Sequence, residues 1–551
     1  MFRHSWRAQT ARLPWAYKKS VPARSALIAS SVVVASVLWY SRHTVLHNDA
    51  LEPLVPEPRT TAWSSWSVSP ADTSGTLKTL VWGSNRAKIL SPLLPISITI
   101  RKPFVATWLD NVALRDLALH ERHAACVDVC GDVYQWGEGY ASTGLEGGPT
   151  RTLSGKGIVK LQLTDRRVFA LSESGKVYVL DSRASNQALM EPPTSPWWKF
   201  WHSPQLIDFA ELKPQHSFGW GERFVSISSG RDHLLALTST GRTYACPINK
   251  DANACGQLGT NLWSPANIPK SIASPSYTAA TSYTGQLPAT DPQSGANNDD
   301  IRFCTTLFEL PVLKGINIVQ VAAGTRSSFA RTQAGQVLAW GANEHGQLGL
   351  GIKVSPDSIT IPTEVVLWPT LSQQSSTRCL GVYAGGDLTG FTVERAPENE
   401  AATVELLMCG DGQWGGLGNN LFSSAQGTPV RVKSLSGLVE YNDATQRLQC
   451  IVPQSINISQ TGHVLATLDP TSGGRDLRAW GRNHDSELGN GKKANAPSPM
   501  PVELAEGRLL LQRKTLVKAV RDLRGNSRRV ALVEQVAAAG PGCTVVYWTP
   551  V

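Results

Sequence analysis

Short runs of alternating apolar and polar residues recur along most of the chain, and glycine-rich turns separate them. In residues 225–247, Val225 and Ile227 have the two-residue period of a half-buried strand, and residues 319–341 repeat the same order of strand, turn and strand. Glycines stand where the hairpin turns need a positive φ, at Gly175, Gly241 and Gly335. The pattern predicts antiparallel strands in repeated units.

Each of these stretches leads into a strand that ends in Trp-Gly and then a loop that ends in Leu-Gly. The clearest copies are residues 337–351 and 478–491, and 177–182 is a copy that has lost its Trp-Gly. The residues that mark this second half of the repeat are Trp82, Gly83, Trp136, Gly137, Gly256, Leu258, Gly259, Trp340, Gly341, Gly346, Leu348, Gly349, Gly410, Trp480, Gly481, Leu488 and Gly489.

The two ends of the chain each carry half of a repeat. At the C-terminus, residues 533–548 form the first half of a repeat, and no Trp-Gly strand follows them. At the N-terminus, the Trp-Gly strand around Trp82 forms a second half, and no first half precedes it. Joining them completes one unit, which is how a ring of blades closes and removes its open edges. We therefore predict an all-β, seven-bladed propeller in which N- and C-terminal strands share one blade.

These residues resemble the repeats of the regulator of chromosome condensation family, over about 76–551. The resemblance is most specific in the copies around Ala245, Trp340 and Trp480, and it implies blades of four strands. We expect the tryptophan to pack between neighbouring blades and the leucine of the loop to fill an apolar gap there. The glycines are expected to take φ and ψ values that other residues avoid.

Three histidines, His123, His233 and His463, recur at one position of the repeat. One interpretation is a set of catalytic or metal-binding imidazoles. Because a residue that recurs with the repeat usually belongs to the architecture, we favour hydrogen bonds that stabilise a turn in each blade.

Function on a repeat scaffold usually lies in what is not repeated, and three inserts depart from the repeat: 183–222, 260–302 and 508–529. The first contains the aromatic residues Trp197, Trp198, Phe200 and Trp201. Such a density of aromatic residues predicts a contact with a membrane or a protein partner, or else a small local core. The second, rich in Ser, Thr, Pro and Asn, has the composition of a flexible excursion.

The third insert interleaves leucines and valines with basic residues, among them Arg513, Lys514, Lys518 and Arg521. Part of it can form a basic amphipathic helix, or two strands joined by a charged turn. It suits an anionic membrane surface or an acidic partner, and a solvated insert is the remaining alternative.

Composition supports a β-rich chain, since glycine (47), proline (34) and tryptophan (18) are frequent among the 551 residues. The net charge of +9 is concentrated before residue 49 and in 508–529, which leaves the main body mildly acidic and disfavours a nucleic-acid binder. Cys126 and Cys130 have no second Cys/His pair at metal-ligand spacing, so we read them as buried residues.

The N-terminus has the composition of a targeting sequence followed by a membrane anchor. Residues 1–24 are Arg-rich and acid-free, as in a mitochondrial presequence. Residues 25–41 are uncharged and apolar, at the lower length limit for a transmembrane helix, with Trp39 and Tyr40 at one end. Residues 42–75 are expected to be a polar linker. The alternative is that the apolar stretch is removed with the presequence.

No phosphate-binding loop, nucleophile elbow or metalloprotease motif is present, so the sequence predicts neither an enzyme nor a cofactor. The layout resembles the membrane-anchored fungal mitochondrial branch of the family, which implies a scaffold for assembly of a respiratory-chain complex, specifically complex III. Its expected partners are proteins and the inner membrane, with the propeller in the intermembrane space, the matrix remaining open. The alternatives are a guanine-nucleotide exchange factor for a mitochondrial GTPase and a matrix regulator of RNA or ribosomes.

Overall fold

The computed structural model describes residues 76–92, 98–141, 148–188, 207–259, 300–354, 356–367, 375–397, 402–442, 446–471 and 473–551. The predicted presequence, anchor and linker, the aromatic residues 197–201 and nearly all of 260–302 lie outside them. Within the described residues there is no α-helix, and no helix there has the length and hydropathy to cross a membrane. The 3-10 turns are η1 (Thr107–Leu109), η2 (Ala184–Asn186), η5 (Pro311–Leu313) and η6 (Lys433–Leu435).

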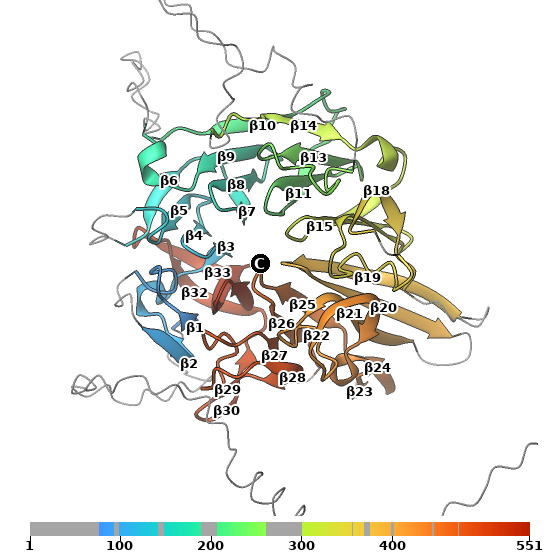
Figure 1. Cartoon of the computed structure of the whole chain (residues 1–551). Coiled ribbons are helices and arrows are strands. Elements are labelled where there is room, and N and C mark those ends of the chain that lie inside the picture. The colour runs from blue at the N-terminus through green and yellow to red at the C-terminus, as the bar shows by residue number, and fades with distance from the viewer. Residues whose placement is uncertain are drawn as a thin grey trace, which may run out of the picture. The chain divides into compact units, whose positions relative to one another are not determined.

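Antiparallel sheets follow one another around a central channel, and the chain visits them in order (Figure 1). The predicted all-β propeller is therefore confirmed as an architecture. One four-stranded sheet contains β3 (Leu114–Leu119), β4 (Ala124–Asp128), β5 (Val133–Trp136) and β6 (Thr150–Leu153). Others contain β15 (Ile318–Ala323), β16 (Ser327–Thr332), β17 (Val337–Ala342) and β18 (Ser358–Glu364), and β19 (Ser375–Gly385), β20 (Leu388–Pro397), β21 (Thr403–Gly412) and β22 (Ser423–Arg431).

Two consecutive sets of four strands are joined into one eight-stranded sheet. The sets are β7 (Ile158–Leu163), β8 (Arg167–Ser172), β9 (Val177–Asp181) and β10 (Ala210–Pro214), and β11 (Phe224–Ser229), β12 (His233–Thr238), β13 (Thr243–Pro247) and β14 (Thr306–Glu309). Their junction is a short parallel pairing of the two outer strands, β10 with β14.

The sheet before the C-terminal strands adds a short strand at its outer side. It contains β25 (Pro453–Ile458), β26 (His463–Leu468), β27 (Arg475–Gly481) and β28 (Ala496–Pro501), and β31 (Leu510–Leu511) pairs with β27. Two small hairpins complete the strands, β23 (Val439–Asn442) with β24 (Arg447–Cys450), and β29 (Glu503–Leu504) with β30 (Gly507–Arg508).

The two ends of the chain meet in one sheet, here called the closing sheet. It contains β1 (Leu80–Ser84), β2 (Thr99–Val105), β32 (Thr515–Arg521), β33 (Ser527–Gly540) and β34 (Cys543–Pro550). Strand β34 pairs with β33 on one side and with β1 on the other, so that Trp82 lies opposite Thr544. The predicted pairing of the first Trp-Gly strand with the C-terminal half-repeat is confirmed.

Each set of four strands is a meander, which gives the ring two different faces. Loops from the first to the second strand and from the third to the fourth strand lie on one face, here called the loop face. The tight turns between second and third strands lie on the other, here called the turn face, with glycines of positive φ at Gly131, Gly175, Gly241 and Gly335. Because β1 is a third strand and β34 a second strand, the described chain enters and leaves on the turn face.

The structure corrects two expectations about the inserts. Strand β10 lies inside 183–222, so part of that range belongs to a sheet and not to an insert. In 508–529 the helix alternative is wrong, because β32 pairs antiparallel with β33 across a turn at 522–526. The strand is selected by its pairing, because the backbone of β32 pairs with β33 from Thr515 to Arg521 while Val517 and Val520 contact the core cluster.

Candidate interaction surfaces

Buried tryptophans tie four of the sheets to the loop of a neighbouring sheet. Trp340 is fully buried, and its indole N–H donates to the carbonyl of Gln257 at 2.9 Å. The same bond joins three other tryptophans to the residue before a buried leucine: Trp82 to Glu487 at 2.6 Å, Trp136 to Ile89 at 2.8 Å and Trp480 to Gly416 at 2.8 Å. The leucines that follow those carbonyls are Leu258, Leu488, Leu90 and Leu417, each at most 2% exposed.

The glycine after each tryptophan has a backbone that other residues rarely adopt. Its φ lies between +96° and +106° at Gly83, Gly137, Gly341 and Gly481, and Gly410, which follows Cys409, has a φ of +105°. A Cβ at Gly341 would lie 2.4 Å from the carbonyl oxygen of Arg326, the residue before β16. Positive φ values are also found in the loops, at Gly256, Gly259, Gly346, Gly349 and Gly489, and at the hairpin turns Gly241 and Gly335.

One degenerate repeat keeps the same acceptor without its tryptophan. Cys409 stands at the tryptophan position, and its thiol donates to the carbonyl of Gln347 at 3.5 Å. The hydroxyl of Thr389 donates to the same carbonyl at 2.8 Å. Leu348, the leucine of this loop, is fully buried. Pairing with the second strand places Leu180 and Cys246 at the tryptophan position of two further repeats, which the sequence pattern did not show.

The repeat histidines lie in the seams between sheets. His233 is fully buried, and its Nε2 lies 2.8 Å from the hydroxyl of Ser328 in the next sheet. Since that hydroxyl donates to Gln257 at 2.8 Å, it accepts from Nε2–H, and the imidazole is neutral. Burial lowers the pKa of His123, His233 and His463 to about 3 in each case. Neutral side chains enclosed in this way are not placed to act as acids or bases on a substrate.

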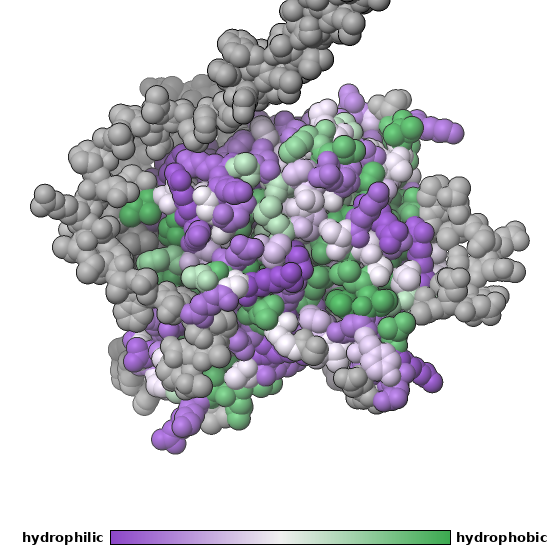
Figure 2. Space-filling model, turned by 90° about the horizontal axis from the view of Figure 1, so that it is seen from below, coloured by the Kyte–Doolittle hydropathy of each residue, from purple (hydrophilic) through white to green (hydrophobic). Residues whose placement is uncertain are grey.

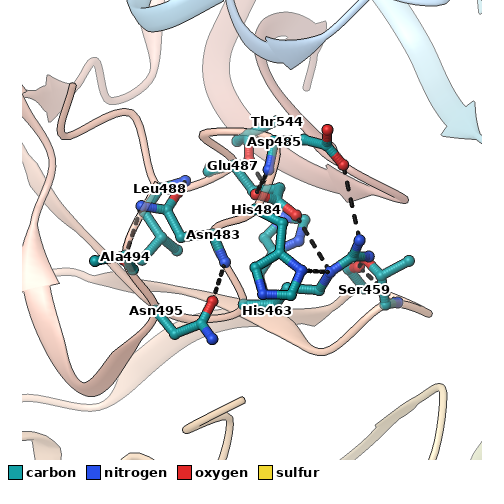
Figure 3. A network of polar contacts seen from close by, with 12 residues as sticks. Ser459, His463, Asn483, His484, Asp485, Glu487, Leu488, Ala494, Asn495 and Thr544 are labelled. Carbon is teal, nitrogen blue, oxygen red and sulfur yellow. Dashed lines mark hydrogen bonds and ion pairs between the residues drawn. The ribbon is translucent and has the colours of Figure 1, made fainter. Parts of the chain in front are cut away.

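Figure 3 shows the loop that meets the closing sheet, residues 483–495. Asn483 holds this loop, accepting from the backbone N–H of Leu488 at 3.0 Å and donating to the carbonyl of Ala494 at 3.0 Å. The hydroxyl of Thr544 donates to the carbonyl of Glu487 at 2.8 Å, across the junction that closes the ring. These contacts serve to hold the loop against the closing sheet.

Glu487 is a buried acid where the other repeats have Gln257 and Gln347. Its carboxylate accepts from the backbone N–H of Asp485 at 2.8 Å, as the amide oxygens of those glutamines accept from the corresponding backbone. Burial raises the pKa of Glu487. The residue therefore closes a turn and is not exposed for catalysis.

The central channel has a volume of about 600 Å³ and is lined by the first strand of every set of four. Two ion pairs lie in its lining, Asp116 with Lys160 at 2.8 Å and Asp165 with the imidazole of His120 at 3.2 Å. Small residues also line the channel, among them Ala323, Ala384, Gly385, Ala538 and Ala539.

One group of side chains among the described residues is close enough to share a metal ion, namely Asp128, Cys130 and Asp522. Each carboxylate already closes its own hairpin turn by accepting from two backbone N–H groups. The guanidinium of Arg528 lies 3.1 Å from the sulfur of Cys130, where a cation would stand. These contacts favour a structural junction between two turns.

Strands β32 and β33 form a basic hairpin on the turn face, here defined as residues 513–533. Ion pairs fix its two ends, Arg513 with Asp469 at 2.8 Å and Arg524 with Asp132 at 2.6 Å. Lys514, Lys518 and Arg521 are exposed, and no acidic side chain of the described residues pairs with them. The hairpin is thus held at both ends and presents unpaired cations between them.

A second exposed feature of the turn face is the hairpin of β23 and β24. Tyr441 lies opposite Leu448, so both side chains share one side, and they are 55% and 64% exposed. Val439, two residues before Tyr441, shares that side and is 48% exposed. On the rim seen from below in Figure 2, hydrophobic patches alternate with hydrophilic ones and do not merge into a continuous band.

Comparison with known proteins identifies the repeat. Family models described as the regulator of chromosome condensation (RCC1) repeat match residues 318–347 and 334–391. The chain is 24% identical over 397 residues to Protein FMP25, mitochondrial, of Saccharomyces cerevisiae, across 67% of this chain and 56% of that protein. It is 24% identical over 470 residues to human E3 ubiquitin-protein ligase HERC2, across 78% of this chain and 8% of HERC2. The chain thus spans little more than half of the yeast relative's length and a small part of HERC2.

Solved structures share the fold. Prp20p of Saccharomyces cerevisiae superposes with a TM-score of 0.52 at 16% identity, over 86% of this chain and 92% of that one. Human WBSCR16 superposes with a TM-score of 0.53 at 15% identity, over 86% of this chain and 99% of that one. At these identities the similarity concerns the fold alone.

Proposed function

We propose that this chain, a β-propeller that carries regulator of chromosome condensation repeats and resembles a mitochondrial protein of yeast, is a non-enzymatic scaffold of the mitochondrial inner membrane. It supports assembly of a respiratory-chain complex, which we take to be complex III, the cytochrome bc1 complex. The observation that carries the proposal is the resemblance to the mitochondrial relative over two thirds of the chain.

The proposed domain layout follows the sequence. Residues 1–24 are the presequence, 25–41 the single membrane anchor, 42–75 the linker and 76–551 the propeller. We count the two halves of the eight-stranded sheet as separate blades, which gives seven blades. A presequence followed by a span that stops in the membrane leaves the propeller in the intermembrane space.

The repeat residues are assigned to the architecture and the non-repeated ones to partners. The buried tryptophans, leucines and glycines hold the seams between blades, and this leaves the faces of the ring for binding. Protein contacts are assigned to Trp197, Trp198, Phe200 and Trp201 and to the exposed side of β23–β24 around Tyr441. The neutral histidines and paired channel charges support binding over catalysis.

The test of location is protease protection of C-terminally tagged protein in mitochondria and mitoplasts, together with carbonate extraction. Digestion that requires rupture of the outer membrane, from a carbonate-resistant pool, is the expected result. Protection in mitoplasts would place the propeller in the matrix. Absence from purified mitochondria would remove the basis of the proposal.

The test of function is native electrophoresis of respiratory complexes from cells that lack the protein, with pulse labelling of mitochondrial translation. We expect complex III to decrease while translation continues at the normal rate. A primary loss of translation would favour the matrix RNA or ribosome regulator. Stimulated nucleotide release from a mitochondrial GTPase by purified protein, with complex III intact, would favour the exchange factor.

A further inference from the structure

We propose that the basic hairpin of β32 and β33 lies on the anionic surface of the same membrane that the proposed anchor enters. It would act as a second contact that orients the turn face toward the lipid. The inference rests on the proposed anchor at 25–41 and adds a lipid-binding surface to the propeller itself.

The first observation is where the chain enters the propeller. Leu77 is 3% exposed and packs in one cluster with Val520 and Val533 of the hairpin and with Trp548. The backbone N–H of Leu77 donates to the side-chain oxygen of Asn111, and the carbonyl of Asn111 accepts from the backbone N–H of Arg521. The segment that leads back to residues 25–41 therefore begins against this hairpin.

The second observation is the length of chain before that point. A flexible linker with as many residues as 42–75 has a root-mean-square span of about 30 Å. A tether of this reach would raise the local concentration of the propeller at the membrane without fixing which face meets the lipid. The potential of anionic headgroups acts within a Debye length of about 8–10 Å, which is shorter than this span, so a second contact on the propeller is needed to hold cations at the lipid surface.

The third observation is the chemistry of the hairpin. Leu516 lies opposite Leu532, so the two leucines share one side, and they are 69% and 39% exposed. Lys518, two residues after Leu516, shares this side, and Val517 on the other side packs on the core cluster. Val520, four residues after Leu516, is on the same side but is 2% exposed in the core cluster, so the exposed part of this side is the segment around Leu516, Leu532 and Lys518. That segment combines leucines with a cation, as interfacial membrane segments do.

Two cations of the hairpin form ion pairs, and four others do not. Arg513 and Arg524 are neutralised by Asp469 and Asp132. Lys514, Lys518, Arg521 and Arg529 are exposed, and none of them has an acidic partner among the described residues. An anionic lipid surface would satisfy several of these charges at once without requiring a shaped pocket, which the hairpin lacks.

The test is lysine labelling of the full chain in lipid nanodiscs that contain either anionic or only zwitterionic lipid. We expect the reactivity of Lys514 and Lys518 to fall roughly fivefold or more in anionic discs and to recover at high salt. Lys492 and Lys493, which are exposed on the loop face, are the internal controls and should react equally in both discs. Equal reactivity of Lys514 and Lys518 in the two discs would overturn the inference.

Charge variants test whether the cations of the hairpin cause the protection. Replacing the four cations together (Lys514→Gln, Lys518→Gln, Arg521→Gln and Arg529→Gln) should expose Leu516 to solvent labelling in anionic discs. The control replaces Lys250, Lys492 and Lys493 by Gln and should leave the protection intact. Protection of Lys514 in whole mitochondria but not in anionic discs would assign the hairpin to an acidic protein partner and overturn the lipid contact. Failure of the full chain to insert into any disc would instead refute the anchor.

Discussion

At the residue scale, the seam between two sheets depends on a single carbonyl oxygen. Gln257 accepts from the indole of Trp340 and from the hydroxyl of Ser328, one group from each of two adjacent strands. The acceptor belongs to the backbone, so the loop can change sequence while the bond persists. This explains why Cys409 can replace a tryptophan and still donate to Gln347.

Replacing Trp340 by Ala should lower the free energy of unfolding by about 3–5 kcal/mol, because it leaves a cavity and removes a hydrogen bond in a sealed seam. Trp340→Phe keeps most of the volume and should cost about 1–2 kcal/mol. Trp220 is fully exposed, and Trp220→Ala is the matched control, expected to change the value by less than about 0.5 kcal/mol. Urea unfolding measures the free energy of unfolding of all three variants. An equal loss for Trp340→Ala and Trp220→Ala would contradict the stabilising role of Trp340 between the two sheets.

The buried histidines predict how stability depends on pH. Their pKa values are lowered to about 3 from the ordinary 6.5, so below pH 6.5 the unfolded chain binds protons that the folded chain does not. Stability is therefore complete above pH 6.5 and is lost as pH falls. At pH 5.5 each histidine should cost about 1.4 kcal/mol.

Unfolding of the protein at pH 7.5 and 5.5 measures this loss. The double variant His233→Gln and His463→Gln should lose less stability between the two pH values than the unaltered protein. His216 is exposed, so His216→Gln should leave the pH dependence unchanged. A pH dependence that is identical in the double variant would contradict the assignment of the loss to these groups.

At the element scale, the glycine after the tryptophan decides whether β1 can pair with β34. Gly83 has a φ of +106°, and a Cβ there would lie 2.4 Å from the carbonyl oxygen of Gly542. Gly83→Ala should therefore cost about 3 kcal/mol or more, since backbone atoms cannot move aside. Gly315 has a φ of +85° with nothing within 4 Å, so Gly315→Ala isolates the conformational cost of about 1–2 kcal/mol. Equal losses in urea unfolding would exclude the predicted clash.

Strands were predictable from sequence where they carry the repeat, and were missed where their partners are distant. The pairing of the first Trp-Gly strand with residues 533–548 followed from counting unmatched halves. Strand β10 was missed because its five residues have no repeat signature and pair partly with β14, across an insert. The hairpin of β32 and β33 stayed ambiguous because leucines and cations alternate irregularly, and contact with Leu77 and Trp548 selects the strands.

At the scale of the whole molecule, the ring is closed by one strand that has partners from both ends of the chain. Removing β34 would separate β33 from β1 and expose two strand edges, as well as Trp82 and its neighbours in the core. Sheets far from the junction, such as β15–β18, make no pairing with β34. Opening the ring at this junction should therefore destabilise the adjacent strands before the distant sheets.

Deletion of residues 543–551 should abolish amide protection in β1 and β2 and lower overall stability by more than about 4 kcal/mol, measured by hydrogen exchange and urea unfolding. Deletion of 549–551 alone is the control, because the pairs from Val545 to Tyr547 remain in place. Protection in β15–β18 should outlast protection in β1, since those strands keep all their partners. Unchanged protection in β1 would mean that the ring does not depend on its terminal strands. The expected result would also link closure of the ring to the proposed membrane contact. Leu77, where the described chain begins to pack, shares a core cluster with Val520 and Val533 of the basic hairpin and with Trp548 of β34. Loss of β34 would therefore disturb the packing that holds the basic hairpin in place.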